Sequence, residues 1–233
     1  MTVRYGAAVF LLVVLSSAGV VSATDAVIPT ADEAERMMRQ DVAVRQKLEA
    51  RMAELGRDAK RVAAAMSQGE VRSELCKVCH GADGNSVREG TPSLAGQNAA
   101  YLIEQFQRYA DHRRYDYWMS SLSETLGDED KLQLAVFYSR NRMVPSRGGD
   151  PALLERGGEI YRTYCTECHG PDGRGREGYA RLAGQRPEYT LKMLKEFRTA
   201  GGKRYNPWMY GRANMLQDER DMLAVATYLA HLE

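Results

Sequence analysis

The four cysteines of this sequence fall in two five-residue motifs, residues 76–80 and 165–169, and each motif reads C-x-x-C-H. Two thiols on one turn of chain can add to two vinyl groups of one haem, and the adjoining histidine can then bind the iron. The spacing therefore predicts two covalently bound haem c groups. The predicted thioether ligands are Cys76, Cys79, Cys165 and Cys168, and the predicted proximal iron ligands are His80 and His169.

Zinc is the alternative partner for these cysteines, because paired C-x-x-C units also bind zinc. The two pairs of a zinc ribbon usually lie about 15–20 residues apart. In this sequence the two pairs are separated by the length of a small domain, and a histidine follows each pair. Both features favour haem. The motifs also use every cysteine, so none remains for a disulfide or for a nucleophile.

A haem held by one histidine still lacks an axial ligand, and a methionine occurs at corresponding places in both halves of the sequence. Met119 and Met209 each follow a tryptophan and lie almost equally far after the histidine of their motif. A thioether ligand favours ferrous iron and raises the reduction potential. Methionines without a counterpart are interpreted as core filler. We predict Met119 and Met209 as the sixth ligands, which leaves neither iron open to a substrate.

The sequence segments that must position these ligands occur twice in the chain. Each motif is followed by a glycine-rich turn, a Leu-Ala-Gly-Gln segment, a helical stretch, a Trp-Met pair and a last apolar helix. So long a repeat indicates duplicated domains and not a solenoid. We predict a first domain over residues 69–142, a linker rich in proline and glycine over residues 143–152, and a second domain over residues 153–233.

Residues 24–68 are predicted to form a helical extension before the first domain. From residue 31 to about residue 68 there is no proline and one glycine, Gly56, among strong helix formers. Thr30 or Asp32 is a suitable N-cap. The apolar residues of this stretch alternate in four-three spacing: Leu48, Met52, Leu55, Ala59, Val62 and Met66. Such a seam packs either on the body of its own chain or on a partner or second copy, and both interpretations stay open.

Residues 1–23 have the pattern of a secretory signal. Arg4 precedes an apolar run at residues 7–15, and the small residues at 21–23 offer a cleavage site. Bacterial c-type haem is attached outside the cytoplasmic membrane, so we predict a periplasmic protein released by cleavage. A retained segment that anchors the chain, or peripheral membrane association, is the alternative.

The composition excludes some classes of function. The 32 Lys and Arg residues nearly balance the 31 Asp and Glu residues, so there is no basic excess of the kind that binds nucleic acid. The sequence also lacks a nucleotide-binding glycine loop and a recognisable Ser/His/Asp set. No catalytic residue is predicted.

The duplicated C-x-x-C-H-G-x-D-G motif, the Leu-Ala-Gly-Gln segment, the methionine and the Leu-x-Asp-Glu start of the last helix resemble the dihaem cytochrome c4 family. The resemblance covers about residues 69–232. It implies an all-α fold of two tandem class I cytochrome c domains, in this chain preceded by a long N-terminal helix. It also implies a low-spin carrier that takes electrons from a donor dehydrogenase or quinol-oxidising complex and passes them to a terminal oxidase, and that is not an enzyme.

The family pattern implies two further contacts and shows two departures. The carbonyl of Pro92 should accept the Nδ1 proton of His80, and Ala180 takes the place of that proline in the second domain. Class I domains also pack an aromatic residue, four positions before the first cysteine, on the last helix. Tyr161 fits this role, whereas Arg72 stands there in the first domain, so we expect that contact to be rebuilt.

Two other functions stay open. A dihaem oxidoreductase, of the peroxidase or thiosulfate dehydrogenase type, would need a labile ligand at one iron. A cytochrome subunit of a dehydrogenase complex would use residues 31–68 as its docking element.

Overall fold

The computed structural model describes residues 30–176, 178–199, 204–216 and 218–233. The predicted signal at residues 1–23 lies outside these ranges. The described chain is helical, and its one β-type contact is an isolated antiparallel bridge between Arg114 and Arg204. An all-α fold is therefore confirmed. None of the described helices combines the length and the apolar character needed to cross a membrane.

The stretch predicted as one helix from residue 31 to about residue 68 is two helices, α1 (Ala31–Gly56) and α2 (Ala59–Arg72). Thr30 caps α1, and its side chain and that of Glu33 exchange hydrogen bonds with each other's backbone N–H groups. Asp58 then starts α2 by accepting hydrogen bonds from the backbone of the first turn. Gly56 and the capping aspartate thus break the helix within an unbroken apolar seam.

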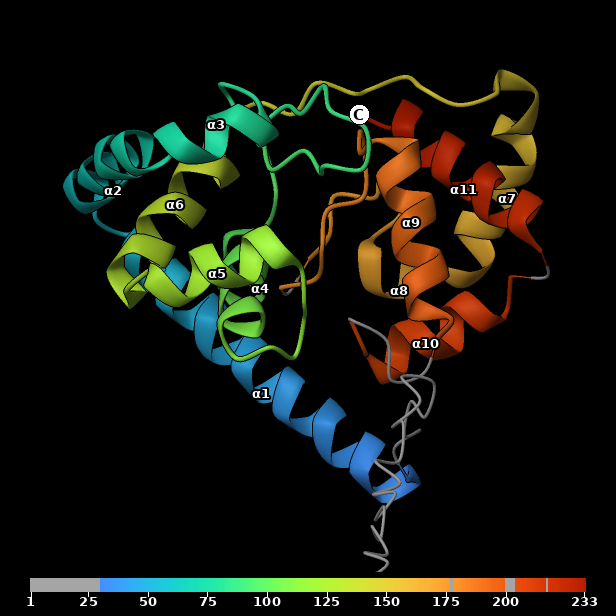
Figure 1. The fold of residues 1–233 in the computed structure, drawn as a ribbon, viewed down its shortest axis with the longest axis horizontal. Coiled ribbons are helices and arrows are strands. Elements are labelled where there is room, and N and C mark those ends of the chain that lie inside the picture. The colour runs from blue at the N-terminus through green and yellow to red at the C-terminus, as the bar shows by residue number, and fades with distance from the viewer. Residues whose placement is uncertain (1–29, 177, 200–203, 217) are drawn as a thin grey trace, which may run out of the picture.

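Two units with the same order of helices follow α1. The first unit (residues 59–142) contains α2, α3 (Glu74–His80), α4 (Ala99–Ala110), α5 (Tyr117–Thr125) and α6 (Asp128–Arg140). The second unit (residues 151–233) starts with a 3-10 turn and contains α7 (Leu154–Tyr164), α8 (Thr166–His169), α9 (Pro187–Phe197), α10 (Pro207–Asn214) and α11 (Glu219–His231). The units lie side by side, joined by a helix-free connection over residues 141–150 (Figure 1).

In each unit the first and last helices cross at a glycine. A Cβ atom on Gly69 of α2 would collide with the Gln133 carbonyl of α6. In the second unit, a Cβ atom on Gly157 of α7 would collide with the Ala224 carbonyl of α11. Only glycine permits so close an approach of two helix backbones. Because α2 makes this crossing, we describe the first unit from residue 59; the predicted start of the first domain at residue 69 stays a prediction.

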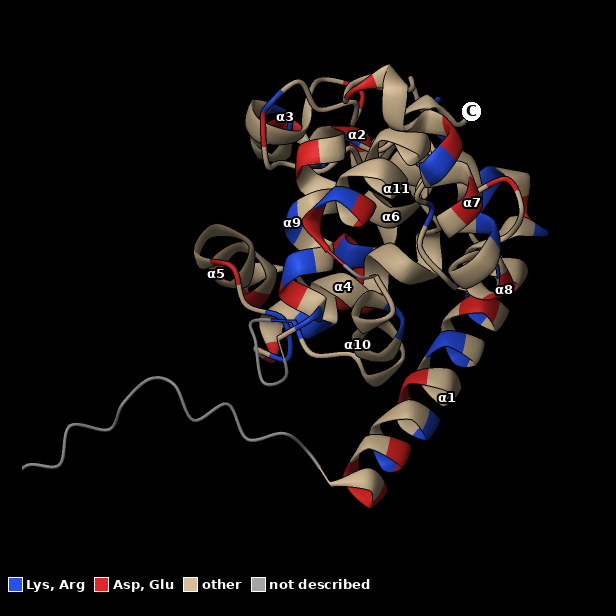
Figure 2. Cartoon of the chain, turned by 90° about the vertical axis from the view of Figure 1, so that its right-hand side faces the viewer, with Lys and Arg blue, Asp and Glu red and all other residues tan. Residues whose placement is uncertain are grey.

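The hydrophobic seam of α1 and α2 packs on the chain's own body. Leu48 and Leu55 of α1 are buried in the core of the first unit, and Met52, Val62 and Met66 pack against that core. The seam is therefore used within the chain. The N-terminal end of α1, residues 31–40, extends away from the two units (Figure 2) and is rich in Arg, Asp and Glu.

Candidate haem sites

His80 ends α3 and is buried. Its Nδ1 lies 2.9 Å from the Pro92 carbonyl oxygen. A carbonyl can only accept a hydrogen bond, so Nδ1 carries the proton and Nε2 keeps a lone pair. Burial lowers the pKa of this histidine, which favours the neutral, ligating form. The contact implied for Pro92 is present.

His169 repeats this arrangement at the end of α8. Its Nδ1 lies 2.9 Å from the Ala180 carbonyl oxygen, and burial lowers its pKa as well. The exchange of proline for alanine therefore leaves the acceptor in place, because the contact uses the backbone. Both predicted proximal ligands are thus held in one tautomer with Nε2 available.

All four cysteines are half-buried, and in each motif the second cysteine directly precedes the histidine. Cys76 packs against the core of the first unit, and Cys165 against the core of the second. Burial raises the pKa of Cys76 and raises the pKa of Cys165 to about 12. The sulfur atoms of Cys76 and Cys165 therefore lie in apolar surroundings, which suit a thioether better than a thiolate.

Met119 and Met209 occupy the same helical position in the two units. Each is the third residue of its helix, α5 or α10. The Met119 backbone N–H donates to the side chain of the capping Asp116 (3.2 Å), and the Met209 N–H donates to the capping Asn206 (3.0 Å). Both methionine side chains are partly buried and pack on core residues. A capping side chain therefore fixes the backbone of each predicted sixth ligand.

Two arginines lie where the units meet: Arg114 is buried and Arg204 is half-buried. The guanidinium of Arg114 donates to Gln105 and to the Tyr189 hydroxyl (2.9 Å each). That of Arg204 donates to the Tyr101 hydroxyl and lies over the Phe197 ring. These acceptors are neutral, so hydrogen bonds hold the two positive charges without cancelling them. Haem propionates are anions, and the pair fits them as counter-charges. The cysteines, histidines, methionines and arginines together fit a haem in each unit.

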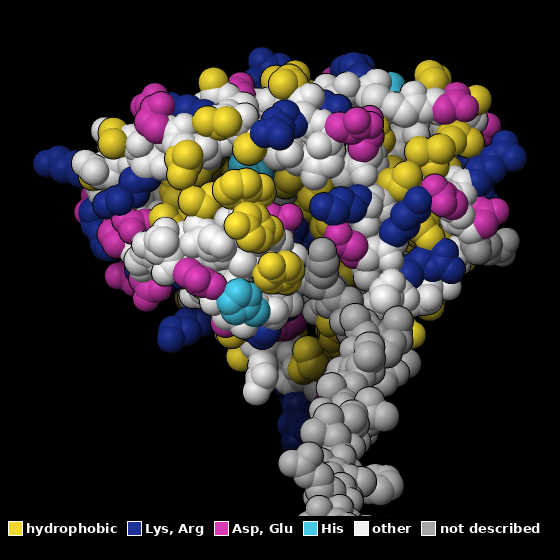
Figure 3. All heavy atoms as spheres, in the orientation of Figure 1, with side chains coloured by type: hydrophobic (Ala, Val, Ile, Leu, Met, Phe, Trp, Pro, Cys, Tyr) yellow, Lys and Arg dark blue, Asp and Glu magenta, His cyan; other side chains and the backbone are white. Residues whose placement is uncertain are grey.

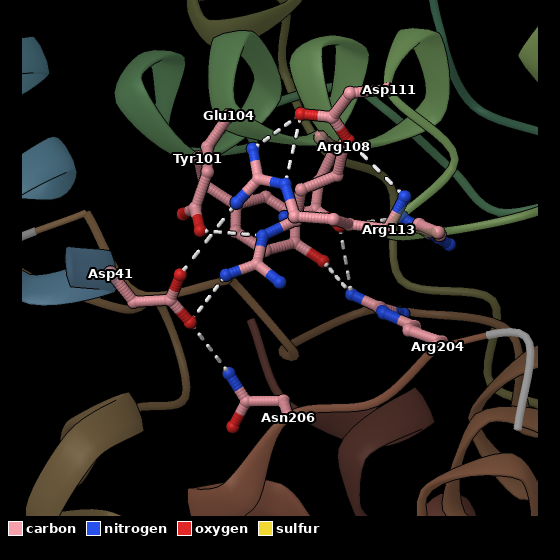
Figure 4. Close-up of polar contacts among 10 residues, drawn as sticks. Asp41, Tyr101, Glu104, Arg108, Asp111, Arg113, Arg204 and Asn206 are labelled. Atoms are coloured by element: carbon pink, nitrogen blue, oxygen red, sulfur yellow. Dashed lines mark hydrogen bonds and ion pairs between the residues drawn. The ribbon is translucent and has the colours of Figure 1, made fainter. Parts of the chain in front are cut away.

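The helix α1 also reaches these sites. Asp41 pairs with Arg108 of α4, which also bonds Glu104 (2.8 Å), and all three side chains are buried. The same carboxylate oxygen of Asp41 also accepts a hydrogen bond from Asn206 (3.4 Å), the residue that caps the helix of Met209 (Figure 4). One buried carboxylate of α1 therefore touches both units.

Arg45, one turn further along α1, lies on the proximal side of the second unit. Its guanidinium stacks over the Tyr179 ring at 4.2 Å, and that ring lies edge-on to His169 at 6.2 Å. Sequence reasoning missed both α1 residues. Residues 41 and 45 continue the four-three seam toward the N-terminus as polar members, which is the signal that could have found them.

A family model for cytochrome c matches residues 154–233, which is the second unit. The chain is similar to cytochrome c4 of Pseudomonas aeruginosa, with 32% identity over 180 residues that cover 70% of this chain and 87% of that protein. It is similar to cytochrome c4 of Thiocapsa roseopersicina, with 33% identity over 177 residues that cover 70% and 91%. The crystal structure of reduced recombinant cytochrome c4 from Pseudomonas stutzeri superposes with a TM-score of 0.67 at 31% identity, over 72% of this chain and 98% of that one.

Proposed function

Because the chain belongs to the dihaem cytochrome c4 family and is an electron carrier of the c type, we propose that it holds two haem c groups, one in each unit, and works in the periplasm. The observation that carries the proposal is the matched pair of histidines. Each commits Nδ1 to a backbone carbonyl and leaves Nε2 for an iron.

The residues of the two proposed sites have equivalent roles. The first site takes its thioether bonds from Cys76 and Cys79 and its axial ligands from His80 and Met119. The second site uses Cys165, Cys168, His169 and Met209 in the same way. When bound, each iron alternates between the ferrous and ferric states. A methionine sulfur favours the ferrous state, which suits an acceptor of moderately high potential.

In the proposed sites a histidine and a methionine bind each iron, so neither iron would offer an open coordination position to a substrate. This symmetry supports the carrier over a dihaem oxidoreductase, which needs one labile position. The proposed redox partners are a donor dehydrogenase or quinol-oxidising complex and a terminal oxidase. Export through the segment at residues 1–23 is part of the proposal, and those residues lie outside the described ones.

A redox titration followed by visible spectra tests the proposal. The purified protein should keep two haems through denaturing electrophoresis, show two one-electron steps and, when reduced, bind carbon monoxide poorly. Met119→Ala and Met209→Ala should each remove half of the far-red iron–sulfur band, lower one potential and open one haem to carbon monoxide. Met215→Ala, at an exposed methionine, is the matched control. Stoichiometric carbon monoxide binding by the wild-type protein would overturn the carrier proposal.

A further inference from the structure

Two glutamines make reciprocal contacts between the units. They are Gln97 and Gln185, the last residues of the repeated Leu-Ala-Gly-Gln segments, and each is 5% exposed. Gln185 Oε1 accepts the Ser93 N–H (2.8 Å), and Gln185 Nε2 donates to the Ser93 carbonyl (3.0 Å). Gln97 Oε1 accepts the Arg181 N–H (2.6 Å), and Gln97 Nε2 donates to the Arg181 carbonyl (2.9 Å). Each glutamine thus makes two hydrogen bonds to a loop of the opposite unit.

The N–H groups that donate to the glutamines belong to the peptide groups that orient the histidines. The Ser93 N–H and the Pro92 carbonyl are two ends of one peptide group, and that carbonyl accepts the Nδ1 proton of His80. In the second unit, the Arg181 N–H and the Ala180 carbonyl form the corresponding peptide group, which accepts from His169. A single peptide group therefore connects each histidine to a glutamine of the other unit.

The glutamine side chains are held in place by their own units. Gln97 Oε1 also accepts the N–H of Asn98, which caps α4 (2.9 Å). Gln185 Oε1 accepts the N–H of Arg186, which precedes α9 (3.0 Å). The start of a helix in its own unit thus helps to fix each Oε1. An acceptor held in this way has little side-chain entropy left to lose on forming the contact.

A hydrogen bond to the N–H of a peptide strengthens its carbonyl as an acceptor, because hydrogen bonds in a chain polarise one another. A stronger acceptor at Nδ1 makes the imidazole a more basic ligand. A more basic ligand stabilises ferric iron, so the reduction potential falls. Removing a glutamine should therefore make the histidine at the far end of its contact a less basic ligand. The reduction potential of the iron that this histidine would bind should rise.

We propose that Gln97 and Gln185 are crossed positioning residues: each sets the ligand strength of the proximal histidine in the opposite unit through one shared peptide group. This inference rests on the proposed function, since it concerns the irons that His80 and His169 would bind. The potential of each haem then depends on whether the other unit is docked. By linkage, the contact between the units depends on the oxidation state of both irons.

The test compares Gln185→Met and Gln97→Met with the wild type. Gln185→Met should raise the potential of the haem in the first unit more than that of the second, and Gln97→Met should do the reverse. The haems are told apart by the ε-methyl resonances of Met119 and Met209. In the reduced protein, the Nδ1 proton resonance of His80 should move upfield with Gln185→Met, and that of His169 with Gln97→Met.

Arg186→Met is the control for a general loosening of the interface. It removes another hydrogen bond between the units, from Arg186 Nη1 to the Ser86 carbonyl (3.4 Å), without touching either shared peptide. It should leave both histidine resonances in place. Gln185→Glu keeps an acceptor for the Ser93 N–H and strengthens it by its charge. It should therefore move the His80 resonance downfield. This variant provides a second test of the proposal if Gln185→Met does not fold.

Changes confined to the haem of the mutated unit, equal changes at both haems, or no change would each overturn the crossed assignment. So would a shift in the same direction from Gln185→Met and Gln185→Glu. A wild-type protein without two His/Met haems would instead overturn the proposed function, and the titration of that protein alone reveals it.

Discussion

Tyr161 in the second unit and Arg72 in the first occupy the same position, four residues before the first cysteine of the motif, yet they make different contacts. Tyr161 is fully buried, lies 5.7 Å from the Tyr228 ring of α11 and donates to the Gly170 carbonyl (2.5 Å). Arg72 is exposed and bonds Asp130 (2.7 Å) and Gln133 (2.8 Å) of α6. The expected rebuilding of this contact is confirmed. In the first unit the ion pair and hydrogen bond of Arg72 replace the aromatic pair of the second unit.

The first unit compensates from outside its own repeat. Leu48 and Leu55 of α1 belong to its core, whereas among the described residues the buried core of the second unit is formed by that unit, starting at Leu153. The two helix crossings therefore tolerate exchange of their side chains as long as the glycine contact remains and apolar volume is supplied. In the first unit that volume comes from α1.

The surfaces of the units differ too. Most of the exposed large hydrophobic side chains belong to the first unit or to the connection that follows it: Val71, Leu75, Val78, Val87, Tyr115, Tyr117, Trp118 and Val144. The second unit exposes Trp208 and Met215. Hydrophobic side chains gather over the region of α5 in Figure 3. A redox partner therefore meets two chemically different surfaces on the two units.

The largest expected effect comes from removing the contribution of α1 to the first unit. Leu48→Ala and Leu55→Ala should each cost about 2–5 kcal/mol, because each leaves a cavity in a packed core. Amide hydrogen exchange should show a loss of stability in α6 and a much smaller loss in α11. Arg51→Ala, at an exposed position of α1, is the control. Equal losses in both units would contradict a role confined to the first core, and a change of mass in solution would indicate a helix-mediated dimer.

The aromatic position gives a contrast of similar size. Tyr161→Ala should destabilise the second unit by about 3–5 kcal/mol, as for other buried aromatic residues. Arg72→Ala should cost the first unit no more than about 1 kcal/mol, since its ion pair is solvent-exposed. Urea unfolding of both variants provides the measurement. If Arg72→Ala lowered the stability as much as Tyr161→Ala, the contacts of Arg72 would be part of the core. The contrast between the two crossings would then fail.

Asp41→Asn tests the contact of α1 with both units. The change leaves Arg108 with Glu104 alone and weakens a buried charged contact, so we expect a loss of about 1–3 kcal/mol. Burial opposes the charge of Arg108, but the neighbouring carboxylates of Glu104 and Asp41 outweigh it and raise the pKa of the guanidinium. Thermal unfolding measures the loss, with Glu49→Gln on α1 as the control. Proteolysis within α1 should also become faster, and unchanged proteolysis would argue against a latch at Asp41.

The smallest expected effect is a pH dependence of the first unit. The Asn85 backbone N–H donates to Asp83 (3.0 Å) and lowers the pKa of that carboxyl. A lowered pKa stabilises the fold above the ordinary carboxyl value of about 3.9, and this stabilisation is lost as the pH falls below it. The loss should be less than about 1 kcal/mol because Asp83 is exposed. Urea midpoints at pH 5 and pH 3 should differ less in Asp83→Asn; an equal difference would exclude this carboxyl.

The site was more predictable than its surroundings. The motif spacing and the matched tryptophan–methionine pairs are local patterns, and the structure places His80, His169, Met119 and Met209 at equivalent positions. The break of the first helix was missed, because the apolar seam runs through Gly56 without interruption and hides the cap at Asp58. The contacts of Asp41, Gln97 and Gln185 could not be predicted, since periodicity within a segment does not say which distant loop it meets.

Contacts of α1 with the second unit close long loops of the chain. Arg45 meets Tyr179 across 134 residues, and Asp41 meets Asn206 across 165. Closing such loops costs conformational entropy, and contacts of this kind form late in folding. The first of the described helices therefore completes its docking last, after the loops of the second unit have formed. Protection of α1 from proteolysis thus reports that both units have matured.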